Sequence, residues 1–349
     1  MPVKNKKIYE CTLSFKNRIR AHAYQAIAGF ISLEKMGIIS LKIEYNNDIH
    51  LPMENVFRCR VNDINVYYDV EDGTENLLPD FEDYLHKENS ILFKRAYEEK
   101  LYKNDILIRP YGFNYIKRTN TLLDRPTSFL AKRGLLPLPT RIFRHLFSNI
   151  DEWSFAGRTR CYPIKILFCS RLWSPQDTHS PVEEINENRI RTIISLRQAF
   201  QNKIVAGVAD SSISRKICKD LILPTYITNR KKYLELIKSS AICIATTGLH
   251  RSIGWKFGEY VASGKVIVSE PLLFKVPGDF RERHNYLSFS SSEELIEKCN
   301  YLLSHPEISR KIEQNNTNYY FNYLRPDVLI WNTIKQAIDY NVNFPEYLH

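Results

Sequence analysis

The sequence predicts an α/β chain that folds into two doubly wound domains. Apolar runs of strand length alternate with amphipathic runs of helix length in both halves, which is the pattern of strand–helix–strand units. The chain has 349 residues, more than one hydrophobic core usually serves. Between the halves, residues 126–153 break the alternation with three prolines. We therefore expect one domain over residues 1–160 and a second over residues 161–349.

The first half begins with a predicted strand and a long helix. Further strand patterns follow, one of which ends in an acidic turn, and a short helix comes next. The expected strands are residues 7–15, 38–45, 56–61 and 64–70, and the expected helices are residues 21–36 and 81–88. Residues 91–102 fit a strand or a helix, and residues 105–115 predict a strand followed by a turn. This order favours a mainly parallel sheet.

The second half alternates more regularly, with short connections between strands and helices. The expected strands are residues 164–170, 203–208, 241–247 and 266–270, and the expected helices are residues 182–201, 229–239, 252–263, 292–304, 306–323 and 326–340. Regular alternation of this kind is typical of a doubly wound domain, in which ligands bind at the carboxyl ends of the strands.

The charge of the chain favours anionic partners. The formal net charge is +10 and the isoelectric point is about 9.1. Bases predominate in residues 117–144, whereas residues 61–86 are rich in acids and contain no Lys or Arg. Such a balance suits nucleotide phosphates, nucleic acid or an acidic membrane surface. The seven cysteines are odd in number and widely spaced, which indicates reduced thiols rather than disulfides or a zinc site.

No signal peptide opens the sequence, and no run approaches the roughly 18 apolar residues of a membrane span, so we expect a cytoplasmic protein. Residues 127–150 mix Phe and Leu with Lys and Arg. Two interpretations of this stretch stay open. It would bind the anionic inner face of the cytoplasmic membrane as a peripheral contact, or it would pack its apolar residues inside the fold.

Residues 246–272 are the most informative part of the chain. They predict a strand end, a turn at Gly248, a helix, a second glycine turn and another strand. His250, Arg251 and Lys256 lie near the start of the helix, where unpaired N–H groups and the helix dipole favour a phosphate. Glu259, further along the helix, could accept both hydroxyls of a ribose. The alternative is a solvated basic helix end with an ordinary surface glutamate.

Arg171 follows the first strand of the second half, at residues 164–170. An arginine at that carboxyl end could reach a diphosphate, because ligands of open α/β sheets bind there. The alternative is a surface arginine in a loop.

In this arrangement the second half resembles GT-B glycosyltransferases, and most closely the bacterial "glycosyl transferases group 1"-like and spore-protein-like subgroups. The likeness covers roughly residues 160–340. It rests on Arg171, the turn at 248–251, KFGEYVASGKVIVSEPL, FSSSEELIEKCNYLLSHPE and Arg325 in YFNYLRP. The resemblance implies two Rossmann-like domains facing a cleft, with the C-terminal helix crossing back to the N-terminal domain. It also implies that Glu259 binds the ribose of the donor nucleotide and that Arg171 binds its diphosphate.

One departure bears on the reaction. Retaining members carry two glutamates separated by seven residues, but the position of the first is Arg251 here. This favours an inverting reaction, in which a base deprotonates the acceptor hydroxyl. We expect the base in the acidic turn of the first half, with Asp72 ahead of Asp69 and with Glu71 beside them. His22 and His50 are alternative candidates for the base. The other interpretation of these acids is a solvated surface turn without a catalytic role.

The sequence thus predicts a glycosyltransferase that transfers a sugar from a nucleotide-sugar donor to a glycan or lipid-linked glycan acceptor, in assembly of a bacterial surface polysaccharide such as O-antigen or capsule. Arg109 would lie on the acceptor side. No metal or other cofactor is expected, since bases could neutralise the diphosphate. A nucleic-acid-binding protein and a non-catalytic GT-B-like partner subunit are the alternatives. The bases follow no known nucleic-acid recognition pattern, so nucleic acid is not expected as a partner.

Overall fold

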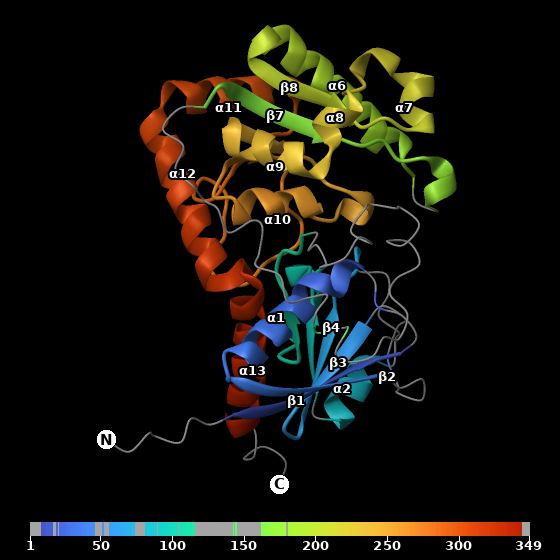
Figure 1. The fold of residues 1–349 in the computed structure, drawn as a ribbon, viewed down its shortest axis with the longest axis vertical. Coiled ribbons are helices and arrows are strands. Elements are labelled where there is room, and N and C mark those ends of the chain that lie inside the picture. Colours follow the sequence, from blue (N-terminus) through green and yellow to red (C-terminus); the bar gives the residue numbers. More distant parts are fainter. Residues whose placement is uncertain are drawn as a thin grey trace. The chain divides into compact units, whose positions relative to one another are not determined.

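The computed structural model describes residues 8–16, 19, 21–45, 51, 56–73, 81–88, 90–103, 105–115, 142, 144, 162–178 and 181–343. The chain forms two compact units (Figure 1). The first unit comprises Met1–Glu152, Phe274–Gly278 and Phe321–His349, and the second comprises Trp153–Leu273 and Asp279–Tyr320. The boundary expected near residue 160 lies outside the described residues.

The first unit contains a six-stranded sheet of order β2-β1-β3-β4-β5-β6. Its strands are β1 (Tyr9–Phe15), β2 (Ile39–Tyr45), β3 (Val56–Val61), β4 (Ile64–Asp69), β5 (Ile91–Lys94) and β6 (Ile108–Pro110). All pairs are parallel except those of β3, which runs antiparallel to both neighbours. The tight turn at Asn62 and Asp63 forces this reversal, with Asn62 at a φ of 50°. The carboxyl ends of the five parallel strands therefore share one edge.

Four helices of the first unit are described: α1 (Tyr24–Lys35), α2 (Phe81–Lys87), α3 (Glu99–Tyr102) and α13 (Pro326–Asn343). Helix α13 packs against α1, and the two helices lie side by side in Figure 1. A Cβ atom on Gly29 would lie 2.2 Å from the carbonyl oxygen of Pro326, so the contact requires glycine. The expected return of the C-terminal helix to the N-terminal domain is confirmed. The ambiguous run at 91–102 contains both β5 and α3.

The second unit contains a five-stranded, fully parallel sheet of order β11-β10-β9-β7-β8. Its strands are β7 (Ile164–Ser170), β8 (Ile204–Val208), β9 (Ser240–Ala245), β10 (Val266–Ser269) and β11 (Leu287–Ser288). A parallel bridge between Val208 and Ile222 adds the remnant of a further strand outside β8. Counted with this remnant, the strand order is that of the Rossmann fold, and the order reverses between β7 and β9.

Helices cover both faces of this sheet (Figure 1). They are α6 (Glu183–Phe200), α7 (Ser212–Ile217), α8 (Thr225–Thr228), α9 (Arg230–Ser239), α10 (Trp255–Ala262), α11 (Ser292–Ser304) and α12 (Pro306–Tyr319). Apolar side chains of α6 and α11 form one core with alternate residues of β7, β9 and β10. Helix α9 contacts β7 and β9, and α10 contacts β9 and β10. The expected α/β class with two Rossmann-like domains is confirmed. Across the described residues, no helix has the length and apolar character that a bilayer crossing demands.

Candidate functional site

The reversal point of the second sheet brings the ends of β7 and β9 together. Arg171 follows β7, is exposed, and stacks its guanidinium 3.7 Å from the ring centroid of Trp173. Asn186 fixes this loop, because its side chain accepts a hydrogen bond from the Trp173 N–H (2.9 Å) and donates one to the Trp173 carbonyl (2.8 Å). The guanidinium predicted to meet a diphosphate therefore lies on a loop that is held in place.

A buried arginine joins the two strand ends. Arg189, on α6, is 7% exposed. Its guanidinium donates to the carbonyl of Arg171 (2.8 Å), to the hydroxyl of Thr246 (3.3 Å) and to the carbonyl of Thr247 (3.0 Å). Burial, followed by the charge of Arg171, lowers the pKa of Arg189 to about 10, while nearby Glu270 opposes the shift. Arg189 thus fixes the spacing between the loops after β7 and β9.

Lys256 supplies a third positive charge at the end of β7. Its ammonium donates to the carbonyl of Cys169 and lies 4.7 Å from the ring centroid of Tyr233. Burial is the main cause that lowers the pKa of Lys256; the neighbouring Cys169 and Glu259 oppose the shift, and the charges of Arg189 and Arg171 add to it. Among the described residues, neither Lys256 nor Arg189 has a carboxylate within ion-pair distance. Repulsion among the three cations is therefore only partly compensated, and an anion bound there would relieve it.

The turn before α10 differs from the expectation. The helix begins at Trp255, so His250 and Arg251 lie in a separate 3₁₀ turn, Leu249–Arg251. Both are exposed and adopt left-handed backbone angles, with φ of 55° and 56°, at a cost of roughly 1–2 kcal/mol each. The Gly248 N–H donates to the Ser252 carbonyl at 2.9 Å. This N–H is thus engaged inside the turn, and the expected donor-binding role of Gly248 stays a prediction.

Glu270, at the end of β10, holds the peptide of Thr247. One carboxylate oxygen, Oε2, accepts from the Thr247 N–H (2.7 Å) and from its hydroxyl (2.6 Å). Arg189 holds the carbonyl of the same residue. Thr247 is therefore fixed from both sides.

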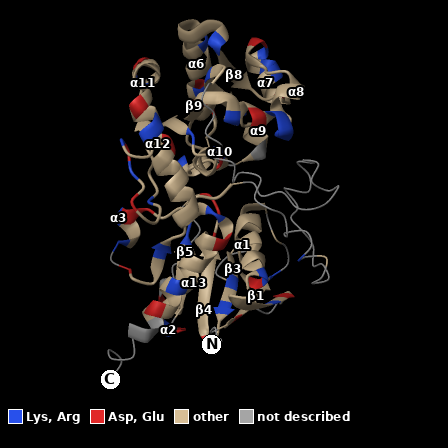
Figure 2. Cartoon of the chain, turned by 60° about the vertical axis from the view of Figure 1, so that its left-hand side comes forward, with Lys and Arg blue, Asp and Glu red and all other residues tan. Residues whose placement is uncertain are grey.

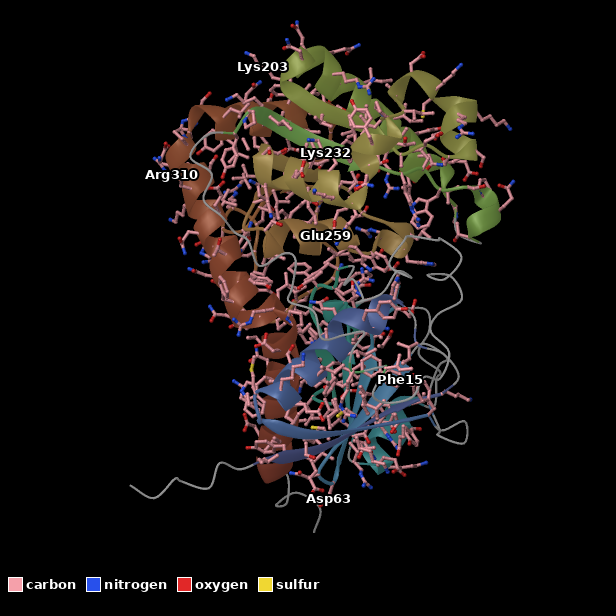
Figure 3. The ribbon with its side chains drawn as sticks, in the orientation of Figure 1. Phe15, Asp63, Lys203, Lys232, Glu259 and Arg310 are labelled. Carbon is pink, nitrogen blue, oxygen red and sulfur yellow. The ribbon has the colours of Figure 1, made fainter. Side chains whose placement is uncertain are left out.

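Glu259 lies inside α10 and its side chain is 3% exposed. Its Oε1 accepts a hydrogen bond from Arg230, the first residue of α9, at 2.9 Å. Figure 3 labels Glu259 on α10 and Lys232 on the neighbouring α9. The carboxylate predicted to hold a ribose is thus buried and neutralised by Arg230, for which the sequence pattern suggests no role.

The acids at the end of β4 and in the turn after it are paired with bases at the end of β5. Asp69 is 1% exposed and its carboxylate accepts from the ammonium of Lys94, which is fully buried. The side chain of Asp72 is 32% exposed and pairs with the guanidinium of Arg95. Figure 2 shows basic residues in blue at β5. Of the two predicted bases, Asp72 is therefore the one that solvent reaches.

His22 and Glu71 form a further pair at this edge. The Nδ1 atom of His22 lies 3.3 Å from Oε2 of Glu71, and their side chains are 20% and 14% exposed. His22 belongs to the 3₁₀ turn Ala21–Ala23 after β1, and Glu71 follows β4. The fold therefore brings together two residues that lie far apart in the sequence. His50 lies outside the described residues.

Arg109 is directed to α13. Its guanidinium donates to the carbonyls of Ile106 (3.1 Å) and Gln336 (3.2 Å) and lies 5.6 Å from the ring centroid of Tyr340. Burial lowers its pKa. These contacts fasten β6 to α13, so the described geometry gives Arg109 a structural role beside the expected acceptor role.

Most of the stretch at 127–150 lies outside the described residues. Arg144 is described, and its guanidinium donates two hydrogen bonds of 2.8 Å to the carboxylate of Glu34 on α1. One base of the expected membrane-binding stretch is thus engaged within the first unit.

Sequence reasoning missed Arg189, although a signal for it exists. Asn186, Arg189, Ile193 and Leu196 follow the spacing of a buried helix face, so Arg189 takes a position toward the sheet. A polar residue at such a position needs partners, and exposed strand ends supply them. The pairing of Lys94 with Asp69 had no comparable signal, because it depends on the register between β4 and β5.

Comparison with known proteins gives fold-level likenesses. No family model matches the chain, and no curated protein matches it in sequence. A glycosyltransferase from Rickettsia africae is 10% identical over 92% of this chain and 82% of its own, with a TM-score of 0.45. HepE from Anabaena, solved in complex with UDP-glucose, is 12% identical over 95% and 100%, with a TM-score of 0.41. A putative UDP-N-acetylglucosamine 2-epimerase from Listeria monocytogenes is 11% identical over 97% of both chains, with a TM-score of 0.46.

Proposed function

We propose that the protein is a glycosyltransferase whose second unit binds the diphosphate of a nucleotide-sugar donor. The observation that carries this proposal is the group of Arg171, Arg189 and Lys256 at the end of β7, where the strand order reverses. In open α/β sheets this is the place for a ligand, and three cations suit a diphosphate. In the described part of the chain, Arg189 and Lys256 have no carboxylate within ion-pair distance.

The reaction is inverting, with a base from the first unit. Asp72 remains the first choice because its carboxylate is partly exposed, although Arg95 pairs with it. The pair of His22 and Glu71 is the second choice, since a carboxylate beside an imidazole orients the ring to accept a proton. Asp69 is less suited, because both it and its partner Lys94 are buried. In either case the base takes the proton of an acceptor hydroxyl while that oxygen bonds to the anomeric carbon of the donor sugar. The bond from this carbon to the phosphate oxygen breaks, and the nucleoside diphosphate leaves with the electron pair.

The acceptor is a hydroxyl of a glycan or lipid-linked glycan in bacterial surface polysaccharide assembly. In support, Glu71 and Asp72 at the carboxyl edge of the first sheet are partly exposed, and each lies against a histidine or a base, so this edge suits an uncharged hydroxyl ligand. We propose that transfer needs no metal ion, because the cations of the second unit would neutralise the leaving diphosphate.

The test is a transfer assay preceded by a donor screen. Thermal shifts with UDP, GDP, TDP and CMP identify the nucleotide, since a ligand that binds the native state raises Tm. The corresponding nucleotide sugars are then incubated with membrane glycan extracts in EDTA, and the products are analysed by mass spectrometry and by proton NMR, which gives the anomeric configuration. We expect a new glycoside with inverted anomeric configuration.

Two matched variants sharpen this assay. Lys256→Met should weaken nucleotide binding by about tenfold to a hundredfold and slow transfer, whereas Lys232→Met, which removes an exposed base of α9, should change neither. Epimerised sugar without a new glycoside would contradict the proposed reaction. Loss of transfer in EDTA would contradict only its metal independence. A retained transfer rate in both Asp72→Asn and His22→Gln would contradict the choice of base.

A further inference from the structure

Two described carboxylates of the second unit, Glu259 and Glu270, bear on the proposed donor site, and they differ in how easily a ligand reaches them. Glu259 is 3% exposed at its side chain and bonded to Arg230. A ligand hydroxyl could reach it only if Arg230 moved away. Glu270 is partly exposed at the carboxyl end of β10. A carboxylate that binds ligand hydroxyls has to be reachable, and this condition favours Glu270.

Glu270 is also held in a fixed position without using its full hydrogen-bonding capacity. The N–H and the hydroxyl of Thr247 both donate to Oε2. Arg189 fixes the carbonyl of Thr247, so the residue that positions Glu270 is itself immobile. Within the described residues, Oε1 of Glu270 accepts no hydrogen bond. A rigid carboxylate oxygen with open acceptor capacity needs little reorganisation to bind a ligand.

The chemistry of this oxygen selects neutral hydroxyl groups. A carboxylate only accepts hydrogen bonds, and one oxygen can accept two, which matches the two O–H groups of a vicinal diol. A phosphate would be repelled by Glu270 and attracted by the cations near β7. Strands β10 and β7 are separated by β9, so the two sites lie about two strand spacings, roughly 10 Å, apart. A nucleotide sugar is long enough to place a phosphate at one and hydroxyls at the other.

We propose that Glu270 binds a vicinal diol of the donor, a role that the sequence resemblance gives to Glu259. The inference rests on the proposed function and adds the residue that recognises the neutral part of the ligand. The diol belongs either to the ribose or to the transferred sugar.

The variant Glu270→Gln separates ligand binding from structural support. The amide oxygen of Gln can still accept from the N–H and the hydroxyl of Thr247, so the position of Thr247 is retained, while the second acceptor becomes an NH₂ donor. Glu259→Gln tests the residue to which the sequence resemblance assigns the ribose. Glu235→Gln, on the exposed side of α9, is the neutral control. Calorimetric titrations use UDP, GDP, their 2′-deoxy forms, UDP-glucose and GDP-mannose.

If the diol is that of the ribose, wild type binds the ribonucleotide about tenfold or more tightly than its 2′-deoxy form, and Glu270→Gln loses this preference. If the diol is that of the sugar, Glu270→Gln binds the nucleoside diphosphate as wild type does but binds the nucleotide sugar at least about tenfold more weakly. Either result supports the role of Glu270. In both cases Glu259→Gln keeps the preference of the wild type.

Two outcomes would overturn the inference. The first is Glu270→Gln with the affinities of the wild type for every probe, or with one uniform loss for all of them. The second is loss of the ribose preference in Glu259→Gln alone. These results leave the proposed donor site intact. If the wild type binds neither these probes nor TDP or CMP, the proposed function is wrong and this inference falls with it; if it binds TDP or CMP alone, the same titrations are made with that nucleotide and its sugar.

Discussion

The carboxyl edges of the two sheets handle charge in opposite ways. In the first unit each acid of the turn after β4 lies against a base or a histidine: Asp69 with Lys94, Asp72 with Arg95, and Glu71 with His22. In the second unit Arg189 and Lys256 gather at the end of β7 with no carboxylate within ion-pair distance among the described residues. An edge that balances its own charges suits an uncharged ligand, and an edge with excess positive charge suits an anion.

The largest effect should come from breaking the balance in the first unit. Lys94→Met leaves Asp69 buried without its partner, and removal of one member of a buried ion pair costs about 3 kcal/mol or more. We expect that loss in the free energy of unfolding measured with urea. Lys275→Met, which breaks the exposed pair with Glu99, should cost less than about 1 kcal/mol. Equal losses in both variants would remove the distinction between buried and exposed pairs.

The second largest effect concerns the excess charge in the second unit. Lys256→Met should weaken nucleoside diphosphate binding by about tenfold to a hundredfold, because a charged hydrogen bond to phosphate is lost. In the absence of ligand, Tm should stay the same or rise, since an apolar side chain replaces an enclosed cation that has no carboxylate within ion-pair distance in the described part of the chain. Titration calorimetry and a thermal scan measure the two quantities. A variant that loses Tm and keeps its affinity would show that Lys256 serves the fold alone.

A smaller effect should follow from the packing of the turn before α10. A Cβ atom on Gly248 would lie 2.9 Å from the Ser252 hydroxyl oxygen. Gly248→Ala should therefore lower the free energy of unfolding by about 1 kcal/mol, and the added Ser252→Ala should restore part of it. Urea unfolding of the single and double variants measures this coupling. Strictly additive losses would mean that the close approach is not the cause.

The smallest effect is a pH dependence of stability in the second unit. The folded-state pKa of Lys256 is lowered from its ordinary value of 10.5, chiefly by burial. Between the lowered pKa and 10.5 the unfolded chain binds more protons, so this group adds stability as pH rises through that window. The difference in unfolding free energy between Lys256→Met and wild type should shrink as the pH rises from neutral to 10.5, the ordinary pKa of the group. A constant difference over this range would contradict the shift.

The pattern of residues predicted most of the second unit. The run IKILFCS coincides with β7, and Ser292–Ser304 coincides with α11, because buried strands and amphipathic helices have clear periods. Arg171 and Lys256 were correctly placed at the ends of elements. The role of Glu259 as a ribose ligand stays a prediction, and its partner Arg230 lies 29 residues away in the sequence. No local pattern predicts such a pair.

The sequence by itself determined the alternation of strands and helices, the α/β class and the segment in which an anion site would form. These properties depend on periodicity and on neighbours in the chain. Only the tertiary structure decided which charges are neutralised: Asp69 by Lys94, and Glu259 by Arg230. It also decided that the backbone of Thr247 is hydrogen-bonded to both Arg189 and Glu270. The physical reason is that electrostatic and hydrogen-bond partners are chosen by distance in space. Strand order and register set those distances, and they bring together residues that the sequence keeps far apart.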